Sequence, residues 1–383
     1  MRSMLRDVAP YTAAGFGGLL ALYLGVGGSH IDREVFADAA RLALGGASPY
    51  GPYIYPPAGL ALALLALLGP VVWDLLSLAA WAYSCWLLVG AAWPERRARE
   101  RADAAAWVFA VGTVLQPTLL AMAIGQVGLL LLALVLHATL GHGRARGLAL
   151  GLAVAVKLTA AIVLLPLALA RRWRDVVWAV AGAAGSTVLL SLAFPQSVTA
   201  YVGGAWRYAF EIGAQQTAQN HSLAGLVRNA LLPSWIGALA VLAVFIAGVA
   251  AATVAWRRGD ALAGVSISLL AGLLVSPLSW THHWVAAFPV MVLLVRELRG
   301  WTAGILLGGG VLGMLLWLDV LGRVGQLQPA SIGELVVMQW LPLWGLAVLV
   351  WCVRGVILAP PMPSPASSVA LERGLSGPAP RAV

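Results

Sequence analysis

The chain has 383 residues, of which 61% are apolar and only 10% are charged, and its formal net charge is +9. A soluble domain carries about 25% charged residues because its surface faces water, so this composition and the mean hydropathy of +0.88 exclude an ordinary soluble protein and predict an integral membrane protein. The cations stand in short clusters between apolar segments, which is the positive-inside pattern of membrane proteins and argues against nucleic acid as a partner.

Apolar segments alternate with short polar ones along most of the chain. Several are nearly uncharged over the roughly 20 residues that cross a bilayer as a helix, and 17 tryptophans suit aromatic belts at both interfaces. The first segment is too long for the apolar core of a signal peptide, so we expect an uncleaved first helix. The segments lie near residues 8–28, 56–69, 71–93, 104–122, 127–140, 147–170, 176–194, 233–255, 261–280, 284–298, 301–321 and 335–353.

This pattern predicts one all-α, polytopic membrane domain over residues 1–358, with about ten to twelve membrane segments. A tail follows over residues 359–383, and its richness in Pro, Ser and Ala predicts disorder. Arg2, Arg6 and Arg354 place both termini in the cytoplasm by the charge rule.

The topology of residues 56–175 is left open by the sequence. Strict crossing by every segment would place the clusters at 96–101 and 144–146 outside, against the charge rule. An alternative treats 56–93 as one net crossing and 147–170, which is interrupted at Lys157, as a hairpin returning to the cytoplasm. That arrangement keeps every arginine cluster inside and places Gln126 at the outer side.

The first long polar loop, 29–55, begins with an amphipathic pattern that ends at Gly45-Gly46, which predicts a helix lying in the outer interface. Asp32 stands at its start. The residue is either an N-cap or a general base that removes a hydroxyl proton at the membrane surface. Asp32 and Glu34 also form an Asp-x-Glu pair, but residues two apart do not share a helix face, so we expect no metal site.

The same loop continues with four prolines from Pro49 to Pro57, which predict a rigid extended turn. Its tyrosines, Tyr50 and Tyr55 among them, are either interfacial anchors or a wall for a sugar or lipid headgroup.

A histidine pair, His282-His283, follows Pro277 and Trp280 at the outer end of a later segment. The two imidazoles are either interfacial side chains or groups for phosphate binding and proton transfer. No His or Asp at ligand spacing stands nearby, which argues against a metal centre.

The second long loop, 195–232, combines amides, Trp and Arg. Asn220 and its neighbours suit carbohydrate contacts but also suit any solvated loop, whereas Arg207 and Arg228 are candidates for pairing with a phosphate.

Lys157 is the only lysine and lies inside an apolar run. An ammonium there is costly and marks a functional candidate, with snorkelling to the interface as the alternative. Cys85 and Cys352 are expected to be packing residues, and Gly147 and Gly151 form a GxxxG pair typical of close helix packing.

Several of these motifs, in this order, resemble glycosyltransferase family 87, a family with GT-C architecture. The resemblance covers roughly residues 10–300. In this sequence the family's Gly-Gln-x-Asn is Gly-Gln-Val-Gly, with Gly128 in place of Asn. The matching motifs are Asp32 after the first helix, Gly46 with Pro49-Tyr50, Tyr55-Pro56-Pro57, Gly125-Gln126, Gly151 with Lys157, Asn220-His221-Ser222-Leu223 and Ser276 to His283.

The resemblance implies a GT-C helix bundle with extracytoplasmic active-site loops in the plasma membrane. It implies a polyprenyl-phosphate-sugar donor, with mannose as the expected sugar, and a glycolipid or glycan acceptor in the envelope. The expected reaction inverts the sugar carbon, gives an alpha product and needs no metal cofactor.

The resemblance also implies roles for individual residues. Asp32, His282 and His283 are expected to be catalytic; Lys157, Arg207 and Arg228 are expected to bind the donor phosphate; and Tyr50, Tyr55, Gln126, Asn220 and Trp280 are expected to contact the acceptor or sugar.

Two other functions stay open at this point. A transporter or flippase of lipid-linked sugars would also need charge within the membrane, but near its middle, whereas all candidates except Lys157 lie at outer loop boundaries. The other alternative is a scaffolding subunit of an envelope-assembly complex.

Overall fold

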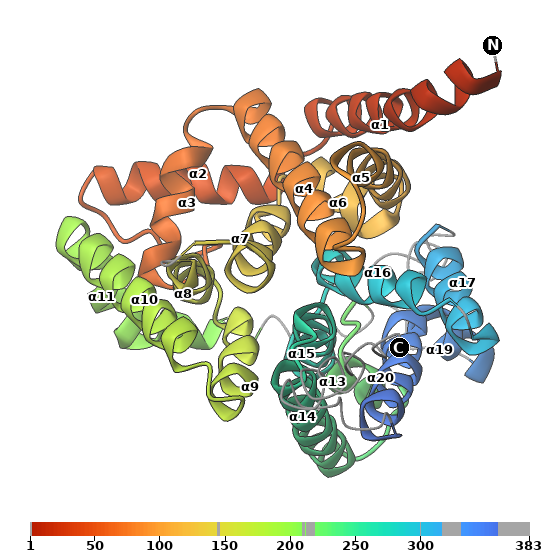
Figure 1. The fold of residues 1–383 in the computed structure, drawn as a ribbon. Helices are drawn as coiled ribbons and strands as arrows, with labels where there is room; N and C mark the ends of the chain where they lie inside the picture. The colour runs from red at the N-terminus through yellow and green to blue at the C-terminus, as the bar shows by residue number, and fades with distance from the viewer. Residues whose placement is uncertain are drawn as a thin grey trace, which may run out of the picture.

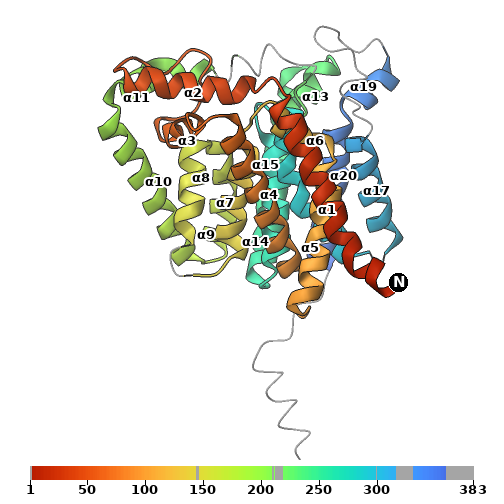
Figure 2. The same cartoon turned by 90° about the horizontal axis from the view of Figure 1, so that it is seen from above.

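The structure is a computed structural model that describes residues 2–143, 146–208, 211, 219–298, 300–315 and 331–358. Over these residues it contains helices and connecting loops but no strand. Most helices lie side by side in one bundle, whereas α2 crosses one of its ends (Figures 1 and 2). The predicted tail 359–383 lies outside the described residues.

Helices of several lengths make up the bundle. Four are long and apolar enough to cross a membrane alone, and up to six spans result if each of two bent helix pairs counts as one. Shorter apolar helices of 10–17 residues pack among them. The prediction of an all-α polytopic membrane protein is therefore confirmed. The predicted membrane segments correspond to a mixture of long helices, bent helix pairs and short apolar helices. The four long spans are Val8–Val26, Pro70–Ala92, Trp173–Ala193 and Ser234–Arg257.

The first part of the chain defines the two ends of the bundle. Helix α1 (Arg2–Val26) leads to α2 (Ile31–Leu44) at the end that we call the Asp32 end. Helix η1 (Pro57–Gly59) and α3 (Leu60–Ala66) stay at that end, because α3 packs along α2 and Arg33 donates to the carbonyl of Ala66 at 3.1 Å.

Helix α4 (Pro70–Ala92) then runs the length of the bundle. Its first turns lie at the Asp32 end, because Asp74 is 3.2 Å from the His30 ring. Residues 56–93 therefore make one net crossing, as the second of the two predicted topologies requires.

The chain returns through α5 (Ala98–Thr113) and α6 (Gln116–Ala123), which are bent by 72° relative to each other where Pro117 opens the new helix. The turn after α6 meets α2, because the His30 N–H donates to the Ala123 carbonyl at 3.1 Å. Helix α7 (Gly128–Leu140) starts from that end.

Residues 147–169 form the predicted hairpin. Helix α8 (Gly147–Val156) ends at Lys157, and η2 (Leu158–Val163) and α9 (Leu164–Leu169) lead back. Arg146 before the hairpin pairs with Asp175 after it, at 3.3 Å. Because one ion pair joins its two ends, the hairpin enters and leaves at the same end of the bundle, with Lys157 near its apex.

The GxxxG pair packs α8 against α10 (Trp173–Ala193), as predicted. A Cβ on Gly147 would lie 2.6 Å from the Asp175 carbonyl oxygen, and one on Gly151 would lie 2.1 Å from that of Ala179. Only glycine allows this approach.

The second half of the chain packs against the hairpin and α7. Helix α15 (Ala261–Val275) begins beside Asp260, whose carboxylate binds Arg296 at the end of α16 (Phe288–Arg296). Helices α15 and α16 are therefore antiparallel, and η4 between them lies near α6 and α7 at the Asp32 end. The elements are α11 (Pro195–Ala200), the π-helical turn η3 (Tyr201–Ala205), α13 (Leu223–Asn229), α14 (Ser234–Arg257), α15 (Ala261–Val275), η4 (Thr281–Ala287), α16 (Phe288–Arg296), α17 (Trp301–Leu315), α19 (Ile332–Met338) and α20 (Trp340–Leu358).

Both cysteines are buried and unbridged, which agrees with their expected packing role.

Candidate active site at the Asp32 end

Asp32 is fixed by the way α2 begins. The N-cap of α2 is His30, in a left-handed conformation with φ of 45°. The Asp32 N–H donates to the Ile124 carbonyl at 2.9 Å, so the first turn of α2 is attached to the turn after α6. The interpretation of Asp32 as an N-cap is wrong, because Asp32 lies inside the first turn.

The Asp32 carboxylate takes part in a buried polar chain. Gln126 donates its side-chain amide N–H to Asp32 Oδ2 at 2.9 Å, and the Tyr55 hydroxyl donates to Gln126 Oε1 at 3.3 Å. Burial raises the pKa of the Asp32 carboxyl above its ordinary value, and the Gln126 hydrogen bond and the charge of Lys157 counteract this. A carboxylate with a raised pKa and a protein partner on one oxygen suits proton abstraction.

The Asp-x-Glu pair does not converge. Glu34 is exposed and its carboxylate contacts the Arg33 guanidinium, whereas Asp32 faces Gln126.

Lys157 meets His283 from the opposite side of the site. Its backbone is extended, with φ −142° and ψ 107°, which separates α8 from η2. Its side-chain nitrogen Nζ lies 2.8 Å from His283 Nε2 and 5.8 Å from the centre of the Tyr55 ring. The amine thus contacts a protein side chain from a half-buried position, which favours a role in the site over snorkelling.

The hydrogen bonds assign the His283 tautomer. The backbone N–H of Trp280 donates to Nδ1 at 3.2 Å. A backbone N–H can only donate, so the hydrogen of a neutral ring resides on Nε2. With this tautomer Nε2–H donates to the Lys157 amine in the 2.8 Å contact, and the amine accepts in its neutral form. An anionic oxygen that enters between the two groups would accept from Nε2–H and from the protonated Lys157.

His282 stands beside this pair. Its ring meets that of His283 edge to face at 4.4 Å, and Trp280 lies 5.6 Å away. The side chain is 5% exposed, and its Nε2 has no hydrogen-bond partner among the described residues. A buried ring nitrogen of this kind is available to a ligand.

Asn220 holds the loop at residues 277–279, which precedes the histidine pair, by hydrogen bonds. Its amide N–H donates to the Pro277 carbonyl at 2.8 Å, and its Oδ1 accepts from the N–H groups of Ser279 and Ser222 at 2.9 and 3.2 Å. These bonds use the side chain to hold the loop, so a sugar contact by Asn220 stays a prediction that these contacts do not support.

Aromatic residues form the wall beside Asp32. Phe36 packs on Tyr55 at 4.7 Å and on Tyr53 at 5.6 Å, and Tyr50 lies 5.8 Å from Tyr201. The Tyr50 hydroxyl is buried without a partner among the described residues. Tyr50 is therefore held by protein rings and keeps a hydroxyl available for a ligand.

Arg207 and Arg228 lie on the surface. Arg207 is exposed, with its guanidinium 5.3 Å from the centre of the neighbouring Trp206 ring, and Arg228 is exposed near the end of α13. Neither lines the cavity described next. Their predicted role in phosphate binding stays a prediction.

A cavity with a polar head runs from the Lys157–His283 pair into the bundle. Lys157, His283, Ser276, Ser279 and Thr159 contribute its polar side chains, and the rest of its lining is apolar. It lies between α7, η2 and α15. The apolar lining residues are Gly128, Leu131, Leu132, Val135, Ala160, Ile162, Leu269, Gly272, Leu273, Leu278, Val285 and Ala286.

One further pair was missed by sequence reasoning. Asp74 is fully buried and its carboxylate contacts the His30 ring, which immediately precedes α2. The signal in the sequence was an acidic residue within the apolar segment 71–93.

The candidate catalytic and donor-binding groups other than Arg207 and Arg228 therefore gather at one end of the bundle. Asp32, Gln126, Tyr55, Lys157 and His283 form one chain of contacts although they come from five separate segments. A transporter was expected to place such groups near mid-membrane, so this location argues against that alternative.

Comparison with known proteins agrees with the site. The family model of glycosyltransferase family 87 matches residues 53–278. The chain belongs to glycosyltransferase family 87. It is therefore a membrane glycosyltransferase, as the motifs predicted.

Three mycobacterial relatives match between 57% and 92% of the chain. A protein of Mycobacterium tuberculosis, a polyprenol-phosphate-mannose-dependent alpha-(1-2)-phosphatidylinositol mannoside mannosyltransferase, is 31% identical over 92% of this chain and 90% of its own length. A protein of Mycolicibacterium smegmatis with the same description is 31% identical over 75% of this chain and 72% of its own length. A polyprenol-phosphate-mannose-dependent alpha-(1-2)-phosphatidylinositol pentamannoside mannosyltransferase of the same species is 31% identical over 57% of this chain and 54% of its own length. No solved structure matches this glycosyltransferase.

Proposed function

We propose that this glycosyltransferase moves a mannosyl residue from polyprenyl-phosphate-mannose to a hydroxyl of a phosphatidylinositol mannoside or a related envelope glycolipid. The relatives' donor and acceptor support the substrate classes. The observation that carries the proposal is the contact between Lys157 Nζ and His283 Nε2, which lie 2.8 Å apart at the head of an apolar cavity.

The donor fits this arrangement in two parts. A phosphate oxygen accepts hydrogen bonds from Lys157 Nζ and His283 Nε2, and the polyprenyl chain lies along the apolar lining between α7, η2 and α15. His282 Nε2, buried without a partner among the described residues, supplies a further contact.

The reaction is a single displacement. Asp32 removes the proton of the acceptor hydroxyl, and that oxygen forms the new bond to the sugar carbon. The bond from this carbon to the phosphate oxygen breaks, and the phosphate leaves with the electron pair. Lys157 and His283 stabilise the charge that develops on it, and attack opposite to the leaving phosphate gives inversion and an alpha product.

The same residues support a metal-independent reaction. The carboxylates of Asp32 and Glu34 bind different partners, and Lys157 supplies positive charge where the phosphate leaves. We expect the transfer rate to stay unchanged in EDTA, and a loss of activity that Mg²⁺ or Mn²⁺ restores would contradict this proposal.

We also propose that the Asp32 end faces outward in the plasma membrane, with both termini in the cytoplasm. The arginines of the opposite end support this orientation by the charge rule.

The test is a transfer assay with purified protein and radiolabelled polyprenyl-phosphate-mannose. Phosphatidylinositol mannosides of increasing size serve as acceptors, and GDP-mannose serves as a control donor. We expect a labelled glycolipid from the lipid donor only, with an alpha linkage. Transfer from GDP-mannose alone would overturn the donor assignment, and movement of the lipid donor across liposomes without product would support the transporter.

A further inference from the structure

A second cavity lies at the end of the bundle opposite to Asp32 and has a basic lining. It measures about 470 Å³ and is built from the loop after α4, the end of α7, the entry to α8, the start of α10 and the α14–α15 turn. Four guanidinium groups line it against one carboxylate, that of Asp260. The arginines are Arg146, Arg172, Arg258 and Arg296.

Ion pairs shape this cavity without neutralising it. Asp175 is shared by two arginines, at 3.3 Å from Arg146 and 2.8 Å from Arg172. Arg296 binds both Asp260, at 2.6 Å, and Glu297, at 2.9 Å. Counting these three carboxylates, the four arginines exceed the acids by one, and one monoanionic group would complete the balance.

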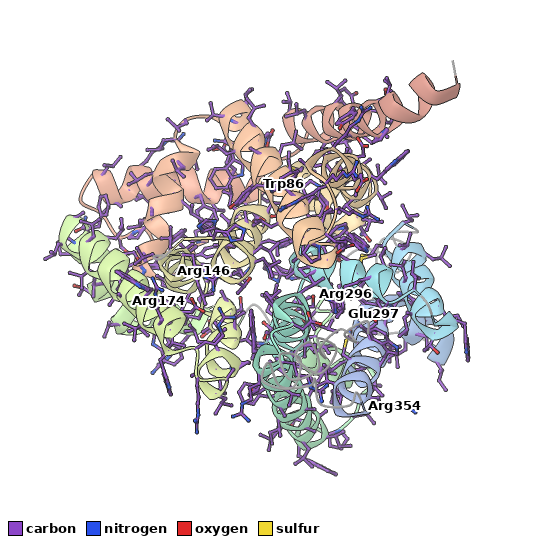
Figure 3. The ribbon with its side chains drawn as sticks, in the orientation of Figure 1. Trp86, Arg146, Arg174, Arg296, Glu297 and Arg354 are labelled. Atoms are coloured by element: carbon purple, nitrogen blue, oxygen red, sulfur yellow. The ribbon has the colours of Figure 1, made fainter. Side chains whose placement is uncertain are left out.

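Several of these arginines are held in place by the protein. Arg146 donates to the Gly141 carbonyl at 2.7 Å, and the Arg172 guanidinium lies 5.2 Å from the centre of the Trp256 ring. In Figure 3, Arg146 and Arg296 lie toward the middle of the bundle, whereas Arg174 and Arg354 lie nearer its rim. Fixed guanidinium groups lose little freedom on binding an anion.

An apolar cavity of about 310 Å³ adjoins the basic one. The two share Arg258, Asp260 and Arg296 in their linings. The apolar cavity runs between α14, α15, α16 and α20, and its lining includes Ile267, Leu293, Ala255, Ala263, Trp351, Cys352 and Val356.

We propose that the two cavities together bind one anionic phospholipid, with its phosphate among the arginines and an acyl chain in the apolar cavity. Positive residues at a membrane interface attract anionic lipid in general. Here they also line a concave site contributed by separate helices and joined to a chain-sized apolar space, which is what recognition of a single lipid requires. The shared residues Arg258 and Arg296 would contact the phosphate at the junction.

The test compares phosphatidylglycerol with phosphatidylcholine of identical acyl chains, each added to the purified full-length protein and measured by native mass spectrometry. We expect one phosphatidylglycerol to be retained in preference to phosphatidylcholine. Arg258→Gln and Arg172→Gln should each weaken that preference about fivefold, as expected for one interfacial arginine. Arg174→Gln, an exposed arginine outside the lining, is the matched control and should leave it unchanged.

A second variant tests the acyl-chain part without touching the arginines. Gly355 lines the apolar cavity, and a Cβ built on it meets no atom within 4 Å. Gly355→Phe should therefore fold, fill the cavity and reduce phosphatidylglycerol retention to the level of phosphatidylcholine.

Three results would overturn the proposal: equal retention of both lipids by the unmodified protein, unchanged preference in Arg258→Gln and Gly355→Phe, or displacement of the lipid by millimolar inorganic phosphate. The last result would assign the basic cavity to a free anion.

Discussion

Asp32 is the residue on which the proposed chemistry depends most. Its carboxylate accepts one hydrogen bond from Gln126 and is partly withdrawn from water, so burial raises its pKa. The base form is the ionised one. Activity is therefore lost as the pH falls through this raised pKa, at a higher pH than for an ordinary aspartate.

Gln126→Met tests that dependence. Methionine keeps the length of the side chain but removes the hydrogen bond that favours the ionised carboxylate. The pKa of Asp32 should rise further, and the acidic limb of the kcat/KM against pH profile should move to higher pH. A limb that stays in place, in a variant of unchanged Tm, would show that Asp32 does not control it.

His283 is predicted to act as a hydrogen-bond donor through Nε2. His283→Ala should raise the KM for polyprenyl-phosphate-mannose by about tenfold or more, the value of one charge-assisted hydrogen bond, with little effect on the acceptor KM. His283→Gln places an amide N–H near the same position and should recover part of the loss. Equal effects of the two variants, or a change confined to the acceptor KM, would contradict the assigned tautomer.

Among the elements, the α8–η2–α9 hairpin carries Lys157 to the site. Its position depends on the close approach of α8 to α10 at Gly147 and Gly151. The helices of this hairpin are too short to cross a membrane in each direction. The hairpin instead places the Lys157 side chain next to His283.

Gly151→Leu should displace this hairpin. Overpacking of a close contact costs about 1–3 kcal/mol, so we expect a lower Tm and reduced transfer. Gly185→Leu on α10 is the matched control, because a Cβ there meets nothing within 4 Å. A Tm of Gly151→Leu equal to that of the control would show that the α8–α10 contact does not hold the hairpin.

Element positions could be predicted where a local pattern sets them. The amphipathic pattern before Gly45-Gly46 gave α2, which ends at Leu44, and the interruption at Lys157 predicted the break after α8. The orientation of α2 was less predictable. Phe36 packs on Tyr53 and Tyr55 while Leu42 is exposed, so much of its apolar face covers protein.

Contacts between distant segments could not be derived from periodicity. Asp32 and Gln126 are 94 residues apart, and Lys157 and His283 are 126 apart. Their order in the chain, matched to a known family, predicted that they act together. The sequence did not predict that Asn220 holds the loop at residues 277–279, because the sequence of a polar loop does not indicate which distant group an amide side chain binds.

Across the whole molecule, the charged residues of the two cavities lie at opposite ends of the helix bundle. Asp32, Lys157 and the histidines gather at one end, and the arginines of the basic cavity gather at the other. This separation agrees with the hairpin topology, in which every arginine cluster stays on one side.

The side of the membrane on which each end of the helix bundle lies can be measured directly. Asp38 and Glu95 are exposed at opposite ends, and the native cysteines are buried. In intact cells a membrane-impermeant maleimide should label Asp38→Cys, whereas Glu95→Cys should react only after permeabilisation. The reverse pattern would invert the proposed topology.

The most direct test of the account is the rate of mannosyl transfer by purified Asp32→Asn protein, measured together with its affinity for polyprenyl-phosphate-mannose. Loss of a general base lowers rates by about 10²–10⁴-fold. We predict a fall of that size with donor affinity within about twofold of the unmodified protein, because Lys157 and His283 remain in place. Transfer at more than about a tenth of the original rate would contradict the assignment of Asp32 as the base.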